Sequence, residues 1–290
     1  MRIVVVGAGA WGTAFAHLLR ARSHDVFIAR RTTIDDAPYE EAELIVLAVP
    51  SKSFREALSH VRGDAPVLSL AKGLDPESGE RLSTLVTGRG VAVLSGPNMA
   101  EEVATGLPGA AVIASEDLEL ALILQKAIHS LAFRIYIGTD VVGVEICGAA
   151  KNVIGLAAGG VDGLGLGDNA KAALITRGLV EMARLGEACG ADQETFSGLA
   201  GMGDLMVTCF HPLGRNRRAG ELIARGASQE EAKAQIGQVV EGLVTAPVLR
   251  DLGGKVGVDM PITEGVCSIL EGKPLHELAA SLMGRRPTEE

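Results

Sequence analysis

Lys151 is a charged residue in an otherwise apolar segment, which makes it a candidate for a chemical role. The residues around it, from Ile146 to Leu156, are small or apolar except for Asn152. A lysine inside such a helix is costly to desolvate unless it pairs with an acid or lines a cleft, and burial lowers its pKa. A lysine in that state can serve as a general acid or base. The alternative is a lysine whose ammonium group reaches solvent past the helix.

Lys72 is a second candidate for chemistry. It follows the apolar run Val67–Leu70, which predicts a short strand. Ligands of a doubly wound sheet bind at the carboxyl ends of its strands, so Lys72 would place a cation at that cleft. A solvated surface lysine is the alternative. The other residues at expected strand ends are Pro50 and Ser51, and Gly96, Pro97 and Asn98.

A third candidate, Asp204, follows the glycine-rich stretch Gly198–Gly203, which we expect to be a flexible turn. Asp204 begins a predicted helix, where it is either an acid of a ligand site or a simple N-cap. Thr208 comes four residues later and therefore lies on the same helical face.

The next predicted helix opens with Gly214, Arg215 and Asn216. Arginine and asparagine at a helix N-terminus suit a phosphate dianion, because free backbone N–H groups and a bidentate cation meet there. For Arg217 and Arg218 we favour a basic capping turn or exposed loop.

The beginning of the chain carries a G-x-G-x-x-G motif at Gly7, Gly9 and Gly12. The first two glycines suit a tight turn and a close approach to a pyrophosphate, and the third lets the following helix pack on the strand. The expected neighbours are a strand over Arg2–Val6, a helix over Thr13–Arg20 and a strand over Asp25–Ala29. This β-α-β context predicts a dinucleotide site, and a glycine-rich turn without a ligand is the alternative.

Strand and helix patterns alternate up to about residue 139, and strand patterns almost vanish afterwards. Further strands are expected over Leu44–Val49, Val67–Leu70, Val91–Leu94, Ala110–Ala114 and Phe133–Ile137, with helices over Ser51–Arg62, Arg81–Val86 and Leu118–Ser130. Later helices are expected over Val141–Ala158, Asn169–Ala188, Leu205–Cys209, Arg217–Arg225, Ser228–Gln235, Thr245–Leu252, Ile262–Leu270 and Leu275–Met283, with a frayed tail over Arg285–Glu290.

These patterns predict an α/β protein with two domains. Residues 1–139 form a Rossmann-type, doubly wound parallel sheet, because strands that are apolar throughout must be covered on both faces. Residues 140–290 form an all-α domain. Only about a dozen residues, Arg30–Glu43, connect the second strand to the third, so a crossover helix barely fits there.

Composition excludes several classes of protein. Hydrophobic residues make up 47% of the 290 residues, which excludes global disorder, and a net charge of −9 argues against nucleic-acid binding. We expect no membrane span, and no signal peptide because the chain starts on a core strand. The four cysteines form no C-x-x-C pair and the six histidines show no metal-ligand spacing, so we expect a cytoplasmic protein without a metal site.

Taken together, the motifs resemble those of bacterial NAD(P)-dependent glycerol-3-phosphate dehydrogenases over nearly the whole chain. The matching segments are Gly-Ala-Gly-Ala-Trp-Gly-Thr at 7–13, Ala-Val-Pro-Ser at 48–51, Ala-Lys-Gly-Leu at 71–74, Ser-Gly-Pro at 95–97, Glu-Ile-Cys-Gly-Ala-Ala-Lys-Asn-Val at 145–153, the run from Asp162 to Gly178, Gly-Met-Gly-Asp-Leu at 201–205, Gly-Arg-Asn-Arg-Arg at 214–218 and Val-Val-Glu-Gly at 239–242.

The resemblance implies interconversion of dihydroxyacetone phosphate and sn-glycerol 3-phosphate with NAD(P)H, in phospholipid precursor supply. By motif match, Lys151 is the catalytic general acid and base, and Asp204 and Lys72 are also catalytic. The predicted substrate site comprises Lys72, Gly96, Asn98, Lys151, Asp204, Thr208, Gly214, Arg215 and Asn216. The predicted cofactor site comprises Gly7, Gly9, Ala10, Trp11, Gly12, Arg30, Lys72, Ala100, Arg215, Val239 and Glu241.

Two features depart from the family pattern. The segment Arg30–Glu43 is shorter than in typical members, and Asn98 replaces a serine or threonine. The second strand ends without an acid but before Arg30 and Arg31, which favours NADPH over NADH as the cofactor, although both are usable if Arg30 only stacks on adenine. The resemblance also allows a homodimer.

Two other functions stay open. A β-hydroxyacid dehydrogenase of the same layout would not need Arg215 and Asn216 as a phosphate clamp. A catalytically silent dinucleotide sensor would not need Lys72, Lys151 and Asp204 together.

Overall fold

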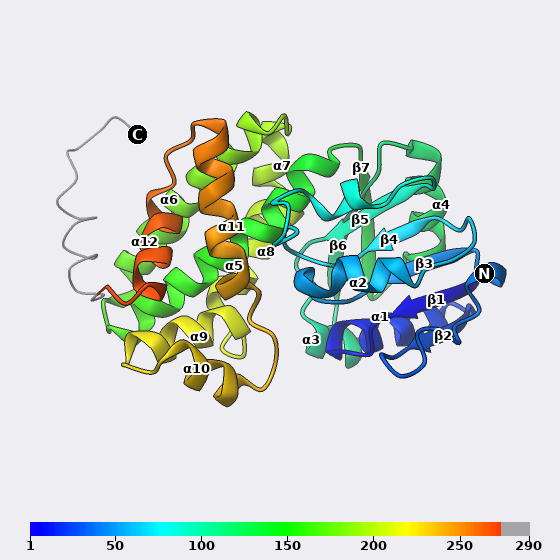
Figure 1. Cartoon of the computed structure of the whole chain (residues 1–290), viewed down its shortest axis with the longest axis horizontal. Coiled ribbons are helices and arrows are strands. Elements are labelled where there is room, and N and C mark those ends of the chain that lie inside the picture. The colour runs from blue at the N-terminus through cyan, green and yellow to red at the C-terminus, as the bar shows by residue number, and fades with distance from the viewer. Residues whose placement is uncertain (274–290) are drawn as a thin grey trace.

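The computed structural model describes residues 1–273, so the expected helix over Leu275–Met283 and the tail Arg285–Glu290 lie outside the described residues. A sheet with its covering helices and a cluster of helices lie side by side (Figure 1). The sheet has the strand order β2-β1-β3-β4-β5-β6-β7. The strands are β1 (Arg2–Val6), β2 (Asp25–Ala29), β3 (Leu44–Leu47), β4 (Val67–Ser69), β5 (Val91–Ser95), β6 (Gly109–Ala114) and β7 (Phe133–Gly138).

Both faces of the sheet are covered, as the continuous apolar strands predict. In β1, Ile3 and Val5 face one apolar core, together with helices α1 (Ala10–Ala21) and α4 (Leu118–Ile128). Val4 and Val6 face a second core on the opposite side. Successive side chains of a strand point to opposite faces, so both sets must be apolar when both faces are covered.

The second face is covered mostly by short elements. Between β2 and β3 there is no α-helix but only a 3-10 turn, η1 (Tyr39–Glu41), so the crossover there is minimal. The expected helix over Ser51–Arg62 is a 3-10 turn, η2 (Ser51–Ser53), followed by a short α2 (Phe54–Ser59). The expected helix over Arg81–Val86 is the 3-10 turn η3 (Leu82–Leu85).

The sheet is parallel, as predicted, except at one position. Strand β6 runs antiparallel to β5, and β7 is parallel to β6. The link between β5 and β6 contains only the five-residue helix α3 (Ala100–Ala104), which was not predicted. A parallel crossover has to return to the opposite edge of the sheet, whereas this link turns back at the carboxyl end of β5.

The second half is helical, as predicted. Its helices are α5 (Val141–Gly163), α6 (Gly167–Ala188), α7 (Gln193–Ser197), α8 (Asp204–Phe210), α9 (Arg215–Ala224), α10 (Gln229–Ile236), α11 (Glu241–Val256) and α12 (Pro261–Leu270). The short α7 was not predicted. The expected flexible turn over Gly198–Gly203 contains a single π-helical turn, η4 (Leu199–Gly203), that leads directly into α8.

Helix α5 is the central element of this half and lies among the other helices in Figure 1. It packs against α6, α8, α9 and α11. Its length and hydropathy alone would allow it to cross a membrane, contrary to our expectation, but 89% of its most apolar window is buried inside the protein. Its apolar composition is therefore explained by its place in a core.

We keep the division into domains at residues 139 and 140 as a proposal. Strand β7 ends at Gly138 and α5 begins at Val141, with the Asp140 side chain accepting a hydrogen bond from the Gly143 N–H at 2.8 Å.

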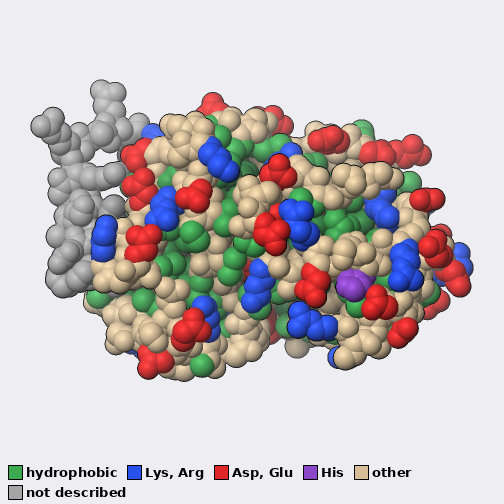
Figure 2. All heavy atoms as spheres, viewed as in Figure 1, with side chains coloured by type: hydrophobic (Ala, Val, Ile, Leu, Met, Phe, Trp, Pro, Cys, Tyr) green, Lys and Arg blue, Asp and Glu red, His purple; other side chains and the backbone are tan. Residues whose placement is uncertain are grey.

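On the face drawn in Figure 2, acidic and basic side chains are interspersed and form no large basic patch.

Candidate active site

The glycine motif forms the turn between β1 and α1. Gly7 has a φ of +112°, and a Cβ on it would lie 2.4 Å from the Ala48 carbonyl oxygen, so only glycine fits beside the end of β3. A Cβ on Gly12 would lie 2.1 Å from the Gly7 carbonyl oxygen. Around Gly9, in contrast, the described residues place no atom within 4 Å of the position where a Cβ would be. Gly7 and Gly12 therefore allow the close packing, and Gly9 leaves open space.

That open space belongs to a cavity of about 590 Å³, lined by Ala8, Gly9, Ala10 and Ala100 among others. Helix α1 begins at Ala10 without a side-chain cap, so its first N–H groups are available to an anion. The cavity, the uncapped helix and the open Gly9 fit the pyrophosphate of a dinucleotide.

Trp11 packs against Phe15 in the core at a ring-centroid distance of 5.6 Å, and its indole N–H has no partner among residues 1–273.

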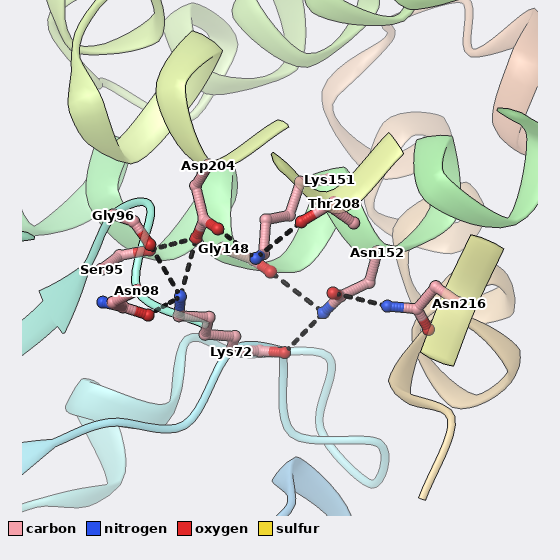
Figure 3. Close-up of polar contacts among 10 residues, drawn as sticks. All are labelled: Lys72, Ser95, Gly96, Asn98, Gly148, Lys151, Asn152, Asp204, Thr208 and Asn216. Carbon is pink, nitrogen blue, oxygen red and sulfur yellow. Dashed lines mark hydrogen bonds and ion pairs between the residues drawn. The ribbon is translucent and has the colours of Figure 1, made fainter. Parts of the chain in front are cut away.

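The residues predicted to be catalytic meet at the carboxyl edge of the sheet (Figure 3). Asp204 is the shared partner: its Oδ1 accepts a hydrogen bond from Lys151 Nζ at 2.6 Å, and its Oδ2 accepts one from Lys72 Nζ at 2.7 Å. Lys151 is 6% exposed, so it does not reach solvent past α5. Asp204 is the first residue of α8 rather than its N-cap, and its carboxylate is used by the two lysines.

Burial and charge both act on these groups. Desolvation lowers the pKa of Lys151 to about 8; the charge of Lys72 acts in the same direction, and Asp204 opposes it. Burial would raise the pKa of Asp204, but the two ammonium groups outweigh it and hold that pKa below its usual value. The site therefore keeps the Asp204 carboxylate charged and brings the pKa of Lys151 close to neutral pH.

Lys72 and Lys151 each have further partners. Lys72 Nζ donates to the Gly96 carbonyl oxygen at 3.2 Å and to Asn98 Oδ1 at 2.9 Å. The buried Nδ2 of Asn98 has no partner in the described part of the chain, so it is free to donate to a ligand. Lys151 Nζ donates to Thr208 Oγ1 at 3.0 Å.

The predicted phosphate clamp lies at the start of α9. A chain of amides connects it to the lysines: Asn216 Nδ2 donates to Asn152 Oδ1 at 2.8 Å, and Asn152 Nδ2 donates to the Lys72 carbonyl oxygen at 2.9 Å. Gly214 is the N-cap residue of α9 and makes no side-chain cap, and Arg215 is exposed. Free N–H groups, a cation and a buried amide are thus gathered at this helix end.

Arg217 does not lie in an exposed loop. Its Nε donates to the Asp162 carboxylate of α5 at 2.6 Å, and it lies within α9, so its role is to join two helices. Arg218 also lies within α9, so the exposed-loop alternative is wrong for both arginines, whereas the helix expected over Arg217–Arg225 includes them.

Glu241 comes from the first turn of α11 and reaches the sheet. Its carboxylate accepts hydrogen bonds from the Ser51 hydroxyl at 2.6 Å and from the Ser51 N–H at 3.2 Å. Burial raises the pKa of Glu241. Val239 is half-buried in the link before α11, and Arg30 is exposed at the end of β2, away from the lysine cluster.

The predictions omitted several residues that the structure brings into the cluster. Asn152 and Ser51 hold predicted site residues, and Ser95 Oγ donates to Asp204 Oδ2 at 3.3 Å. Asn152 carried a usable signal, because it is an amide within an apolar helix directly after Lys151. Among residues 1–273, no three His, Cys, Asp or Glu side chains are placed to hold a metal ion, and the four cysteines are free.

Comparisons with known proteins show which family the chain belongs to. The family model of the NAD-dependent glycerol-3-phosphate dehydrogenase N-terminus matches residues 32–121, and that of the C-terminus matches residues 140–280. The glycerol-3-phosphate dehydrogenase (NAD(P)+) of Moorella thermoacetica is 43% identical, over 99% of this chain and 97% of that protein. The Chlorobium phaeobacteroides protein of the same name is 41% identical, over 100% of this chain and 99% of that protein.

A solved structure is similar as well. The crystal structure of glycerol-3-phosphate dehydrogenase from Coxiella burnetii superimposes with a TM-score of 0.91 at 34% identity, covering 98% of this chain and 99% of that chain. The alignment with the Chlorobium protein spans 331 positions, whereas this chain has 290 residues. This chain is therefore shorter than that relative while matching it from end to end.

Proposed function

Because this chain belongs to the NAD-dependent glycerol-3-phosphate dehydrogenase family, we propose that it interconverts dihydroxyacetone phosphate and sn-glycerol 3-phosphate, with Lys151 moving the proton. The observation that carries the proposal is the sharing of the Asp204 carboxylate between Lys151 and Lys72, beside the start of α9. A bound NAD(P)H supplies the hydride to the carbonyl carbon in reduction, and NAD(P)+ accepts it in oxidation.

Lys151 handles the proton of the reacting oxygen. In the reduction, its ammonium group donates a proton to the carbonyl oxygen as the carbon receives the hydride, which leaves a hydroxyl group and a neutral lysine. In the oxidation, the neutral amine accepts the hydroxyl proton. A pKa lowered to about 8 suits both directions near neutral pH. Asp204 and Thr208 orient the amine through the hydrogen bonds at 2.6 and 3.0 Å.

Two groups of residues hold the substrate. Lys72 and Asn98 lie on the sheet side. The three N–H groups of Lys72 are used by Gly96, Asn98 and Asp204, so Lys72 contributes its positive charge, and the free Nδ2 of Asn98 donates a hydrogen bond to a substrate oxygen. The free N–H groups of α9, with Arg215 and Asn216, bind the phosphate on the helical side. Gly96 and Gly214 supply backbone groups at the two sides.

The cofactor lies along the turn of Gly7, Gly9 and Gly12, and either NAD or NADP serves the family. We propose that NADPH is preferred. Support comes from the end of β2, where Arg30 and Arg31 are both exposed and no acid occupies the position that binds the ribose hydroxyls in NAD-selective proteins. Glu241, Val239 and Ala100 complete the cofactor site in this proposal.

The setting of the reaction is also a proposal. The product carries two hydroxyl groups that can be acylated, which supports a role in the supply of phospholipid precursors. Four free cysteines support a cytoplasmic location. A homodimer stays a prediction, which sedimentation of the purified protein tests.

One assay tests the function. We expect NADPH oxidation with dihydroxyacetone phosphate to be far faster than with unphosphorylated dihydroxyacetone, and kcat/KM to be higher with NADPH than with NADH. Replacement of Lys151 by alanine should lower kcat about 10²- to 10⁴-fold, because a positioned proton donor contributes that much. Equal rates with both ketones would contradict the phosphate clamp, and a Lys151→Ala protein with near-normal turnover would contradict the general acid.

A further inference from the structure

The segment that carries Lys72 has no α-helix of its own. Residues 70–90 connect β4 to β5 and contain only the 3-10 turn η3 (Leu82–Leu85). Leu74 and Arg81 form an isolated antiparallel bridge, which closes the intervening residues into a loop. The Lys72 side chain therefore gets little positional support from local secondary structure and depends on what the segment packs against.

The segment packs against the helical half at three points, two of them on α5. Leu74 is 2% exposed and belongs to the apolar core of the helices rather than to a core of the sheet. Asn152 donates to the Lys72 carbonyl oxygen at 2.9 Å. The third point is Glu145, which lies seven residues before Asn152 and therefore two turns away on the same face of α5.

Glu145 makes a complete set of contacts with the far side of the loop. Its Oε1 accepts a hydrogen bond from the Ser83 N–H at 2.9 Å, and its Oε2 accepts from the Ser83 hydroxyl and from Arg81 Nη1 at 3.1 Å. The Glu145 side chain is only 5% exposed. A carboxylate this deeply buried is costly unless it is fully paired, so the loop and Glu145 hold each other in one arrangement.

We infer that Glu145 is a positioning residue for the reaction: it fixes the loop of Leu74 to Ser83 on α5 and thereby fixes Lys72 relative to Lys151 and Asp204. The inference rests on the proposed role of Lys72. Glu145 and Lys151 belong to the same rigid helix, so fixing the loop to Glu145 sets the distance between the two lysines. Asp204 can accept from both lysines only when that distance is right.

A matched pair of substitutions tests the inference. Glu145→Gln keeps the shape of the side chain but removes the charge and places an amide nitrogen before three donors. The control is Glu181→Gln: Glu181 is also a buried carboxylate and accepts from the Ile262 N–H, the Thr263 N–H and the Thr263 hydroxyl, but it holds the start of α12. We expect kcat to fall about tenfold or more in Glu145→Gln. We expect Glu181→Gln to lower the melting temperature but to keep kcat near the wild-type value.

The pH profile separates positioning from mere loss of stability. The titratable groups that act on Lys151 are Asp204 of α8, which raises its pKa, and Lys72, which lowers it. Two buried thiols, Cys147 on α5 and Cys209 on α8, lie nearby and keep their protons, because burial raises the pKa of each. If Lys72 moves away, its lowering effect on the pKa of Lys151 is lost, while the raising effect of Asp204 remains. The basic limb of kcat/KM should therefore move to higher pH in Glu145→Gln and stay in place in Glu181→Gln.

Two further variants, Ser83→Ala and Lys72→Ala, complete the test. Ser83→Ala removes one donor and keeps the carboxylate paired, so it should show a smaller change of the same kind even if Glu145→Gln folds poorly. A normal kcat and an unmoved limb in Glu145→Gln or Ser83→Ala, with a large loss in Lys72→Ala, would overturn the positioning role alone. Full activity of Lys72→Ala would overturn the role of Lys72 itself, and with it the proposed site.

Discussion

At the residue scale, the site depends on the close approach of two cations to one carboxylate. Asp204 bonds Lys151 at 2.6 Å and Lys72 at 2.7 Å, with all three groups largely out of solvent. A single charged pair would favour a protonated lysine. Burial and the second cation work against that preference, so Lys151 is brought to a pKa of about 8 while it stays hydrogen-bonded.

This arrangement predicts opposite pH dependences for the two directions. Reduction needs protonated Lys151, so its kcat/KM should fall as the pH rises through about 8, whereas kcat/KM for oxidation should rise over the same range. Lys72→Met removes the cation that lowers this pKa, so the limb of its residual activity should move to higher pH. Profiles measured in both directions check this.

The matched control is Lys126→Met, at an exposed position on α4. It should leave both limbs in place. Limbs that are identical in wild type and Lys72→Met would contradict the electrostatic account of Lys151.

Most of these residues could be predicted from the sequence, because their types conflict with their surroundings. Lys151 stands in an apolar helix, and Asp204 follows a glycine-rich stretch. Glu145 also stands in an apolar segment, but nothing in the sequence indicates what it pairs with. Its partners, Arg81 and Ser83, are more than 60 residues away in a segment without a regular pattern, so only the folded chain brings them together.

At the element scale, the crossing of α5 and α9 places the residues of the proposed phosphate clamp. Glycines at positions 155, 159 and 163 form a stripe on α5, and α9 lies directly on it. A Cβ on Gly159 would lie 1.8 Å from the Arg217 carbonyl oxygen, and a Cβ on Gly220 would lie 1.9 Å from that of Leu156. The backbones thus touch, which brings the start of α9 within reach of Asn152.

We therefore predict a specific loss in Gly159→Ala. The added methyl group must push α9 away, which should lower the free energy of unfolding by about 1–3 kcal/mol, as overpacking does. Because Arg215 and Asn216 begin α9, kcat/KM for dihydroxyacetone phosphate should fall about tenfold or more. Denaturant unfolding and steady-state kinetics measure the two effects.

Gly160→Ala provides the control on the same helix. Among residues 1–273, no atom outside the helix lies within 4 Å of its Cβ position, so the substitution should be neutral or stabilise by about 0.5–1 kcal/mol, because alanine is the better helix former. If both variants behaved alike, the contact between α5 and α9 would not be what places the clamp.

The sequence predicted most of the helices and strands. It did not predict the direction of β6 in the sheet or the short helices α3 and α7. The apolar strand β6 reads the same in either direction, and its antiparallel course is set by the short link from β5. The η4 turn contains Gly201, whose Cβ would lie 2.1 Å from the Phe196 carbonyl oxygen. The need for that glycine comes from the close approach of the chain to its own backbone five residues earlier, and it leaves no periodic signal in the sequence.

At the scale of the whole molecule, the proposed active site lies where the two halves of the chain meet. Several polar contacts join them, among them those of Lys72 with Asp204, Asn152 with the Lys72 backbone, Glu145 with Ser83, and Glu241 with Ser51. Apolar packing joins them too, since Leu74, Val93 and Ala114 of the first half belong to the same core as α5.

This shared core predicts that the chain unfolds as one unit although it has two architectures. Loss of the sheet would expose the apolar side of α5 and remove the hydrogen-bond partners of Glu145. Neither half should therefore remain folded alone. Calorimetry of the full chain should give a single transition with matching calorimetric and van't Hoff enthalpies. NADPH at about a hundred times its Kd should raise the stability by about 2.7 kcal/mol and move that whole transition.

Two resolved transitions, or a shift by NADPH of only part of the heat absorption, would contradict this coupling. Glu145→Gln adds a sharper comparison, because it removes a contact between the halves without touching the apolar core. If the polar contacts mainly position the site and the core provides the coupling, this variant should melt at a lower temperature but still in one transition. A second transition appearing in Glu145→Gln would instead assign the coupling to the buried carboxylate.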